Sequence, residues 1–235
     1  MGRETGVNGG RGGAGFFADP DHGFLGESGI VGAGVPIGVG AALASRYDGS
    51  GRVALTAFGD GALNQGAVHE AMSFAAIYRL PVVFVCENNG YAEYTPTASM
   101  FPGGPLEHRA AIYGFPGIAV DGTDPRAVHA KVAGAVARAR DGDGPTLIVA
   151  TARRLAGHHT HDPEHYRPPG EKADWAKEAD PIPKLRRVIL AEGLADEDAL
   201  AKTEAAVRAD IRAAAKSAAK APAADPATLE HHVYA

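Results

Sequence analysis

The sequence has a single cysteine, few aromatic side chains and no long apolar run. Cys86 alone excludes an internal disulfide framework and a zinc site built from several cysteines. No apolar stretch reaches the roughly 18 residues that a membrane-spanning helix needs, and the N-terminus lacks the apolar core of a signal peptide. With 23 Lys and Arg against 28 Asp and Glu, the formal net charge of −5 gives no general attraction for nucleic acid or an anionic membrane. We therefore expect a soluble, cytoplasmic protein that binds neither.

Glycine, in contrast, is abundant, with 31 Gly and 16 Pro residues among 235. Together with 45% hydrophobic and 22% charged residues, this composition is typical of a globular protein with many loops. Residues 1–30 hold ten of the glycines and no apolar periodicity, so a long glycine-rich loop is predicted there. The next segment, residues 30–47, is small and apolar, and its second half predicts a buried helix packed closely on a neighbour.

Two short apolar runs, residues 53–58 and 82–86, predict buried strands joined by a helix from about Asn64 to Tyr78. Strand, helix and strand within about 35 residues form a βαβ unit, which implies a parallel sheet. The pattern continues with a strand at 117–120, a helix from Asp124-Pro125 to about Arg140 and a strand at 146–151. We therefore predict an α/β fold with a parallel sheet and flanking helices.

The C-terminal part has a different character. A polar loop is predicted for residues 153–183, followed by helices near 184–192 and 196–220. The last helix is alanine-rich with charges on one side, which is typical of a packing appendage. We predict an α/β domain over residues 1–180 and a helical appendage over residues 181–235.

Polar turns directly follow the first two predicted strands, Gly59-Asp60-Gly61 and Asn88-Asn89. Both are expected at the carboxyl ends of adjacent parallel strands, where open α/β sheets bind ligands. Mg²⁺ takes one or two oxygen ligands from protein side chains and the rest from phosphate and water. Asp60 offers a carboxylate oxygen, Asn89 an amide oxygen and the chain near Tyr91 a carbonyl oxygen. A magnesium diphosphate therefore fits this pair of turns.

Each turn alone is explained equally well as an ordinary loop. The pair is harder to explain in that way, because both turns end buried strands that one helix connects. Gly61 lets the backbone approach a phosphate, and the helix that follows points its positive dipole end toward the same place.

The segments that carry these turns resemble a known family. The likeness lies in GFLGESGIVGAGVPIGVGAALA and in GDGALNQGAVHEAMSFAAIYRLPVVFVCENNGYAEYTP. These stretches are similar to the alpha subunit of the thiamine-diphosphate-dependent first component of 2-oxo acid dehydrogenase complexes, in the pyruvate and acetoin dehydrogenase branch. The likeness runs from about Gly2 to the C-terminus. It implies the thiamine-diphosphate-binding fold with helices at the C-terminal end.

The resemblance assigns roles to particular residues. It implies that Asp60, Asn89 and the carbonyl of Tyr91 hold Mg²⁺, and that backbone at Gly61 and Ala62 contacts the diphosphate. The remaining cofactor-binding residues that it implies are Gly29 and Val31, through backbone groups toward the aminopyrimidine, and Arg154, toward the diphosphate.

Residues 154–163, RLAGHHTHDP, resemble the family's active-site loop R-x-x-G-H-S-x-S-D-P. The resemblance implies that Arg154 pairs with the diphosphate and that His158 is catalytic, reaching the reacting carbon as a hydrogen-bonding or proton-relaying imidazole. Two rival interpretations stay open, a transition-metal site in this histidine-rich tract and a solvated loop without a role. Cys86, in a predicted buried strand, is expected to pack in the core.

The sequence also departs from the family. The helical segment with which family members begin, and which binds diphosphate and substrate, has no counterpart here. Phe16 stands where the family has a histidine in its glycine-rich loop, and His159 stands at the phosphorylatable serine, so control by phosphorylation there is not expected. The chain is therefore either one piece of a subunit split between two polypeptides or a truncated gene product.

The family implies oxidative decarboxylation of a 2-oxo acid such as pyruvate, or cleavage of acetoin, with acyl transfer to a lipoyl group. The implied partners are a beta subunit in an α₂β₂-type assembly, a lipoyl-bearing acyltransferase and, for a split subunit, a separate N-terminal polypeptide. Two alternatives stay open, a non-catalytic or truncated assembly subunit and a metal-dependent hydrolase that uses the histidine loop. The sequence does not distinguish pyruvate from acetoin or related substrates.

Overall fold

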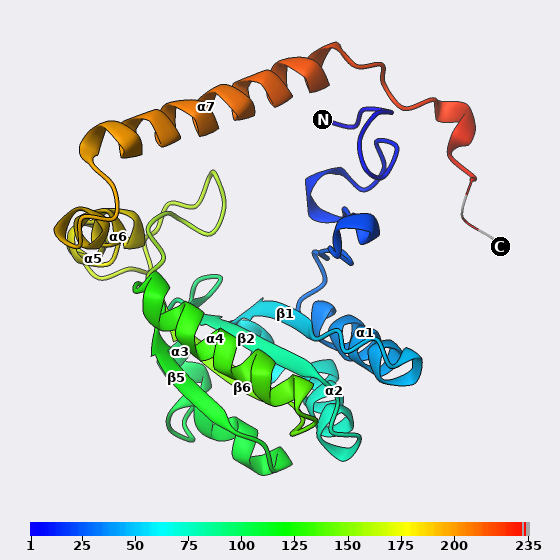
Figure 1. Ribbon diagram of the computed structural model, residues 1–235, viewed down its shortest axis with the longest axis vertical. Coiled ribbons are helices and arrows are strands. Elements are labelled where there is room, and N and C mark those ends of the chain that lie inside the picture. The colour runs from blue at the N-terminus through cyan, green and yellow to red at the C-terminus, as the bar shows by residue number, and fades with distance from the viewer. Residues whose placement is uncertain (232, 234–235) are drawn as a thin grey trace. The chain divides into compact units, whose positions relative to one another are not determined.

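The computed structural model describes residues 1–231 and 233, except for the side chains at positions 14 and 176–178. The chain divides into two compact units (Figure 1). The sheet unit is Val31–Arg187, and the terminal unit combines Met1–Ile30 with Val188–Ala235. The division predicted from the sequence, an α/β domain over residues 1–180 and a helical appendage over residues 181–235, stays a prediction. Its C-terminal part includes residues 232, 234 and 235, which lie outside the described residues.

The sheet unit is built on a four-stranded parallel sheet with the order β1-β2-β6-β5. Its strands are β1 (Ala54–Gly59), β2 (Val82–Asn88), β5 (Gly117–Asp121) and β6 (Thr146–Thr151). The predicted parallel sheet is confirmed, with strand bounds close to those expected. The two central strands, β2 and β6, are almost continuous runs of buried side chains, as parallel strands covered on both faces should be.

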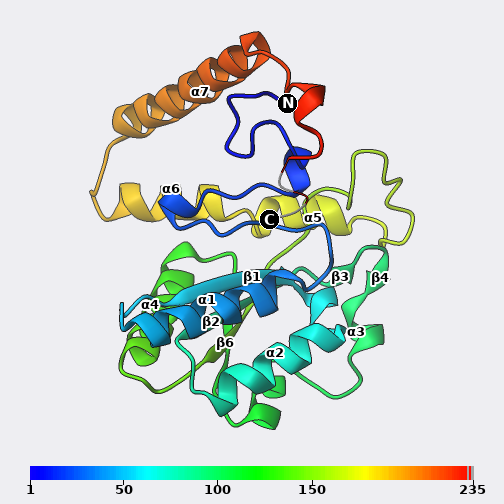
Figure 2. The same cartoon turned by 90° about the vertical axis from the view of Figure 1, so that its right-hand side faces the viewer.

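Helices cover both faces of this sheet (Figure 2). They are α1 (Gly34–Asp48), α2 (Gly66–Ile77) and α4 (Pro125–Arg140). Buried residues of α1 and α2 share one core cluster with Phe84 of β2, whereas α4 packs on a second cluster with Val83 and Ile148. Because successive residues of a strand point to opposite faces, Phe84 and Val83 belong to opposite sides of the sheet. The predicted flanking helices are therefore confirmed.

Glycine lets α1 lie close to β1, as predicted. A methyl group at Gly38 would lie 3.0 Å from Cβ of Thr56. The hydroxyl of Thr56 in turn donates a hydrogen bond to the carbonyl of Gly34, at 3.1 Å. A larger residue at position 38 would push the helix away from the strand.

Shorter elements surround the carboxyl end of the sheet. They are η3 (Asp60–Asn64), β3 (Tyr91–Ala92), β4 (Thr95–Pro96), α3 (Thr97–Met100) and η4 (Leu106–Tyr113). The helix predicted from Asn64 begins at Gly66 instead, because residues 60–64 form the 3-10 turn η3.

The prediction of an uninterrupted loop over residues 153–183 is wrong. It contains α5 (Glu171–Glu178), and α6 (Pro181–Ala191) begins within it. α5 is short and polar, so it has no apolar periodicity that would distinguish it from a loop. Its start is marked only by Gly170, which takes the left-handed φ of 87°.

The terminal unit holds the C-terminal helix α7 (Glu197–Lys220), which begins after Asp196; the side chain of Asp196 accepts a hydrogen bond from the N–H of Ala199 at 2.8 Å. Residues 1–30 contain only the short 3-10 turns η1 (Gly13–Gly15) and η2 (Pro20–His22) as helical elements. Arg3 forms a bridge with Ala223, beyond α7. Within the described residues, none of the helices combines the length and apolar character needed to cross a membrane.

Candidate functional site

Strand register brings the two polar turns to one end of the sheet. Gly59, the last residue of β1, pairs with Glu87 near the end of β2. Asn88, the last residue of β2, pairs with Thr151, which also pairs with Asp121 at the end of β5. All four strands therefore end together, and the chain segments that follow them meet at this carboxyl end, the candidate site.

Asp60 is the first residue after β1, and only 1% of it is exposed. The hydroxyl of Thr97 donates a hydrogen bond to its Oδ2 atom. Its Oδ1 atom is buried and has no hydrogen-bond partner among the described residues. A buried carboxylate oxygen without a partner is unfavourable, because nothing replaces the water that it has lost. A hard cation such as Mg²⁺, which prefers carboxylate oxygens, would provide the missing partner.

The second turn, Asn88-Asn89-Gly90, offers further oxygen atoms. The side-chain oxygen of Asn89 accepts a hydrogen bond from the N–H of Tyr91 at 3.0 Å, and that of Asn88 accepts one from Gly90 at 3.3 Å. An amide oxygen has two lone pairs, so one on Asn89 remains for another partner. The carbonyl of Tyr91 accepts a hydrogen bond from Nη2 of Arg154 at 3.0 Å.

Gly61 and Ala62, predicted to contact a diphosphate, lie in η3. Gly61 is in a confined position, because a methyl group there would lie 2.7 Å from Cβ of Ala92. Ala92 belongs to the small β3–β4 hairpin, so the requirement for glycine at position 61 has a packing cause. Ala62 is buried.

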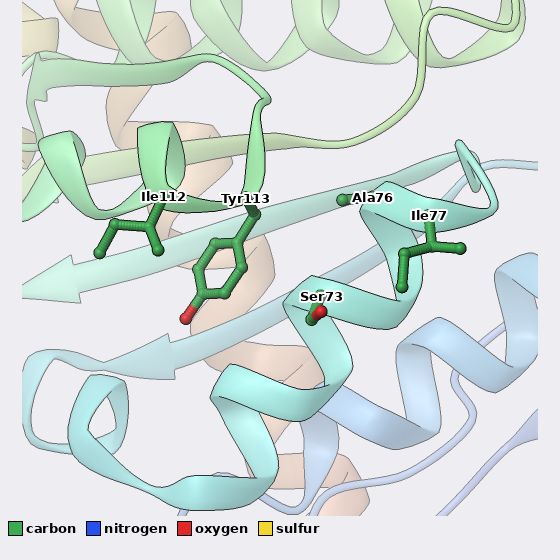
Figure 3. Close-up of a pocket in the computed structure, with 5 residues that line it drawn as sticks. All are labelled: Ser73, Ala76, Ile77, Ile112 and Tyr113. Atoms are coloured by element: carbon green, nitrogen blue, oxygen red, sulfur yellow. The ribbon is translucent and has the colours of Figure 1, made fainter.

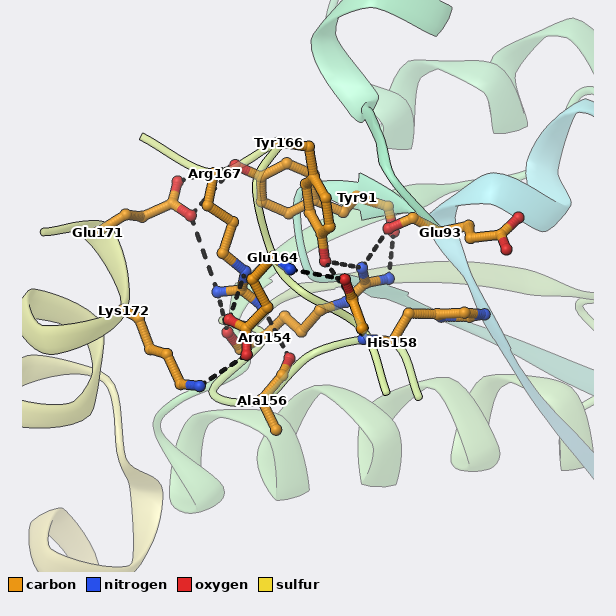
Figure 4. Close-up of polar contacts among 11 residues, drawn as sticks. Tyr91, Glu93, Arg154, Ala156, His158, Glu164, Tyr166, Arg167, Glu171 and Lys172 are labelled. Atoms are coloured by element: carbon orange, nitrogen blue, oxygen red, sulfur yellow. Dashed lines mark hydrogen bonds and ion pairs between the residues drawn. The ribbon is translucent and has the colours of Figure 1, made fainter. Parts of the chain in front are cut away.

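The loop after β6 brings Arg154 to Tyr91 and Glu93, in the β3–β4 hairpin that follows the second turn (Figure 4). Its Nη1 atom donates a hydrogen bond to the carbonyl of Glu93 and lies 3.3 Å from the hydroxyl of Tyr166. The guanidinium carbon also lies 5.7 Å from the ring centroid of Tyr91. Arg154 and Tyr91, two residues that the sequence assigned to one site, are therefore in direct contact.

Asp162 fixes the turn that contains His158. Its carboxylate accepts hydrogen bonds from the N–H groups of His158 (2.7 Å) and Glu164 (2.9 Å) and from the hydroxyl of Tyr166 (2.8 Å). Desolvation raises the pKa of Asp162, but these hydrogen bonds outweigh it and lower the pKa to about 2. The side chain of His158 itself is exposed, with its ring 6.4 Å from that of Tyr94.

The buried side chain of Arg167 forms hydrogen bonds to the backbone of the same loop (Figure 4). Its side chain is only 4% exposed and donates to the carbonyls of Arg154 and Ala156 at 2.7 and 2.8 Å. It forms ion pairs with Glu164 at 3.2 Å and Glu171 at 3.8 Å. The guanidinium also packs on the rings of Tyr91, Tyr166 and Trp175. The backbone around Arg154 is therefore fixed by a buried cation.

Sequence reasoning missed Thr97, Glu171 and Trp175 as part of this arrangement. Thr97 follows a proline and carries no motif. Glu171 and Trp175 lie in α5, which was not predicted, although Trp175 is the single tryptophan of the chain. The presence of a single tryptophan close in sequence to the predicted active-site loop was the one available signal, because a large aromatic ring usually packs against neighbouring side chains.

Three other predicted residues are Val31, Gly29 and Cys86. Val31 precedes α1 and is exposed. Gly29 belongs to the terminal unit, so its role stays a prediction. Cys86 is fully buried in β2, as predicted, and burial raises the pKa of its thiol.

The hydrolase interpretation requires a metal site in the histidine loop. Within the described part of the chain, no group of three or more His, Cys, Asp or Glu side chains is placed to hold a metal ion. A pocket of about 290 Å³ lies elsewhere, between the C-terminal half of α2 and η4 (Figure 3). It is lined by Ser73, Ala76, Ile77, Ile112 and Tyr113. With no carboxylate, imidazole or cationic group in its lining, this pocket offers little for catalysis.

Comparison with known proteins supplies relatives. The family model described as "Dehydrogenase E1 component" matches residues 1–227. The alpha subunit of acetoin:2,6-dichlorophenolindophenol oxidoreductase from Bacillus subtilis (strain 168) is 41% identical, over 88% of this chain and 62% of its own length. The pyruvate dehydrogenase E1 component subunit alpha of Rhizobium meliloti (strain 1021) is 40% identical, over 88% of this chain and 60% of its own. The chain thus spans about 60% of the length of these relatives.

Proposed function

Because this chain belongs to the dehydrogenase E1 component family, we propose that it is the part of an alpha subunit that binds thiamine diphosphate through Mg²⁺. The observation that carries the proposal is Oδ1 of Asp60, which is buried at the carboxyl end of the sheet and has no hydrogen-bond partner in the described part of the chain. Asp60, Asn89 and the Tyr91 carbonyl would hold the metal. All three are oxygen donors, which suit a hard cation, and none is a sulfur or imidazole ligand.

The diphosphate would bind beside the metal. Its partners in this proposal are the backbone at Gly61 and Ala62 and the side chain of Arg154, while backbone at Gly29 and Val31 serves the aminopyrimidine. A guanidinium has five N–H donors, and Arg154 directs two of its nitrogens toward neighbouring oxygens. The remaining donors suit phosphate oxygens.

When bound, thiamine diphosphate supplies the nucleophilic carbon that cleaves the bond beside a carbonyl group. The proposed roles of this chain's own residues are to bind and orient the cofactor and to hold or move a proton. His158 is the proposed catalytic residue, because its imidazole is exposed while its backbone N–H is held by Asp162. An imidazole can hold or release a proton near neutral pH, as acyl-group chemistry requires.

The whole subunit's activity, partners and location follow as parts of the same proposal. The substrate is a 2-oxo acid, with pyruvate first, or acetoin, and the acyl group passes to a lipoyl group on an acyltransferase. The partners are a beta subunit in a heterotetramer and, for a subunit split between two polypeptides, a separate N-terminal polypeptide. The location is the cytoplasm. The support is that the relatives are described as alpha subunits of pyruvate and acetoin enzymes.

The test is Mg²⁺-dependent binding of thiamine diphosphate, measured by calorimetry on the complex purified from the protein's own cells. Asp60→Ala should weaken binding about 100-fold or more, because it removes the only carboxylate proposed for the metal. Asp48→Ala, which removes an exposed carboxylate at the end of α1, serves as the matched control and should bind normally.

Three results would contradict the proposal. Equal affinity in Asp60→Ala and the unmodified chain would remove Asp60 from the metal site. Native mass spectrometry that finds the assembled complex without cofactor would instead favour a non-catalytic assembly subunit. Stoichiometric zinc or iron in elemental analysis would favour the hydrolase.

A further inference from the structure

A single residue connects the two turns of the candidate site. Thr97 is the first residue of α3 and is 9% exposed. Its backbone N–H donates a hydrogen bond to the carbonyl of Gly90 at 2.9 Å, within the second turn. Its hydroxyl donates to Oδ2 of Asp60, in the first turn. The residues on both sides of the site are therefore held by one amino acid.

The β3–β4 hairpin brings Thr97 to this position. Tyr91 pairs with Pro96 and Ala92 with Thr95, so the chain turns back directly after the second turn. Ala92, on one strand of the hairpin, packs tightly over Gly61. A methyl group added at Gly61 would lie only 2.7 Å from Cβ of Ala92. The hairpin thus covers the first turn, and the residue that follows it reaches Asp60.

The hydrogen bond makes the two oxygens of Asp60 different. Oδ2 is occupied by the Thr97 hydroxyl, whereas Oδ1 is equally buried and has no partner among the described residues. A hydroxyl carries one hydrogen, so the carboxylate is held through one oxygen only. The carboxylate then cannot rotate freely, and Oδ1 keeps one orientation. In metal sites generally, hydrogen-bond partners of this kind orient the side chains that bind the metal ion.

We propose that Thr97 is a positioning residue for Asp60, which holds the carboxylate through Oδ2 so that Oδ1 alone is left to bind the metal. This inference rests on the proposed function, because it assigns Thr97 a role toward the same Mg²⁺. Thr97 acts through Asp60 and does not itself bind the cation.

The test compares three variants in the complete complex, with Mg²⁺ and thiamine diphosphate titrated by calorimetry. Thr97→Val removes the hydroxyl and keeps the shape of the side chain, and it should weaken metal-dependent binding by about 10- to 100-fold. Thr97→Ser keeps the hydroxyl and should bind within a few-fold of the unmodified protein. Thr95→Val is the matched control, because it makes the same substitution at an exposed position of the same hairpin.

A double-variant cycle separates positioning from general packing. If Thr97 acts through Asp60, adding Thr97→Val to Asp60→Asn should weaken binding no further than Asp60→Asn alone does. Independent, additive losses would overturn the inference. Melting of the metal-free complexes shows whether each variant is folded; if Thr97→Val is not folded, Thr97→Ser still decides the matter, because weak binding by this variant would mean that the hydroxyl is not the relevant group.

Failure of the inference and failure of the proposed function give different results. If the unmodified complex binds Mg²⁺ and thiamine diphosphate and Thr97→Val binds them equally well, only the role of Thr97 is overturned. If the unmodified complex shows no Mg²⁺-dependent binding, the proposed function is overturned and this inference with it.

Discussion

The phenol oxygen of Tyr91 lies 3.1 Å from each carboxylate oxygen of Glu171. Tyr91 directly follows the second polar turn, and Glu171 is the first residue of α5. Burial and the neighbouring carboxylate of Glu171 raise the pKa of Tyr91 above its ordinary value of 10, so its hydroxyl is protonated and donates at neutral pH. The helix is thereby attached to the residue whose carbonyl is a proposed metal ligand.

Removing this carboxylate should destabilise the sheet unit. Glu171→Ala takes away the acceptor of Tyr91 and one ion-pair partner of the buried Arg167, and we expect a loss of about 1–3 kcal/mol in the free energy of unfolding. Urea denaturation measures it. Glu70→Ala, an exposed glutamate on α2, is the control and should change stability by less than about 0.5 kcal/mol. Equal effects of the two substitutions would show that the contact with Tyr91 contributes nothing.

Gly61 should not accept even a methyl group. Gly61→Ala places Cβ 2.7 Å from Cβ of Ala92, so the hairpin must shift, at a cost of about 1–3 kcal/mol. Thermal denaturation measures the loss. Gly59→Ala, two positions earlier, has open space at Cβ and should be tolerated. Adding Ala92→Gly to Gly61→Ala removes the methyl group that clashes, so the double variant should recover stability. A lack of recovery would mean that the clash is with another residue.

The hydrogen bonds that the carboxylate of Asp162 accepts should persist at low pH. The pKa of this carboxyl is lowered from its ordinary 3.8 to about 2, so its stabilising contribution is complete above pH 3.8 and is lost as the pH falls through about 2. Carbon-13 NMR of the carboxyl group measures its titration directly, with Asp162→Asn used to assign the signal. A midpoint near 3.8 would mean that the hydrogen bonds from His158, Glu164 and Tyr166 are not formed in solution.

Two histidines of the same loop, His158 and His165, provide a matched test. His158→Ala should lower kcat of the assembled complex by about 100-fold or more and leave the affinity for thiamine diphosphate unchanged, because the imidazole is proposed to move a proton and not to bind the cofactor. His165→Ala removes another exposed imidazole and should leave kcat unchanged. Equal loss of cofactor affinity in His158→Ala would indicate a structural role.

The single thiol should be inert in the native chain. Burial and the negative charges of Asp60 and Glu87 raise the pKa of Cys86, so almost no thiolate is present to react. A chromogenic disulfide reagent should label the native chain far more slowly than the urea-unfolded chain, in which the thiol reacts fully. Rapid labelling without denaturant would show that β2 is accessible.

The sequence predicted the sheet because each strand is a short apolar run with clear bounds, and a parallel arrangement follows from the helix between the first two. It predicted for the same reason that the turns with Asp60 and Asn89 follow strands that end together at one edge of the sheet, as the register of β1 and β2 shows. Arg154, His158, Gly29 and Val31 do not directly follow a strand end, and they were identified from the family resemblance instead.

The rest depends on tertiary contacts that no local pattern records. α5 is polar along its length, and its attachment comes from Glu171 and Trp175, which contact or pack near Tyr91 from far along the chain. Thr97 was not identified because its hydrogen bond to Asp60 spans 37 positions. The two-residue strands of the β3–β4 hairpin are too short to show alternation.

The burial pattern of β1 has a consequence beyond packing. Thr56 and Phe58 face the core while Leu55 and Ala57 face outward, on a strand at the edge of the sheet. A slip of one residue against β2 would exchange these sets and bury the wrong side chains. It would also move Asp60 by about 3.3 Å relative to Asn89, more than the length of a metal–oxygen bond. The apolar residues of β1 therefore set the spacing of the polar site that follows it, and a substitution of Phe58 can disturb ligand binding without touching a ligand.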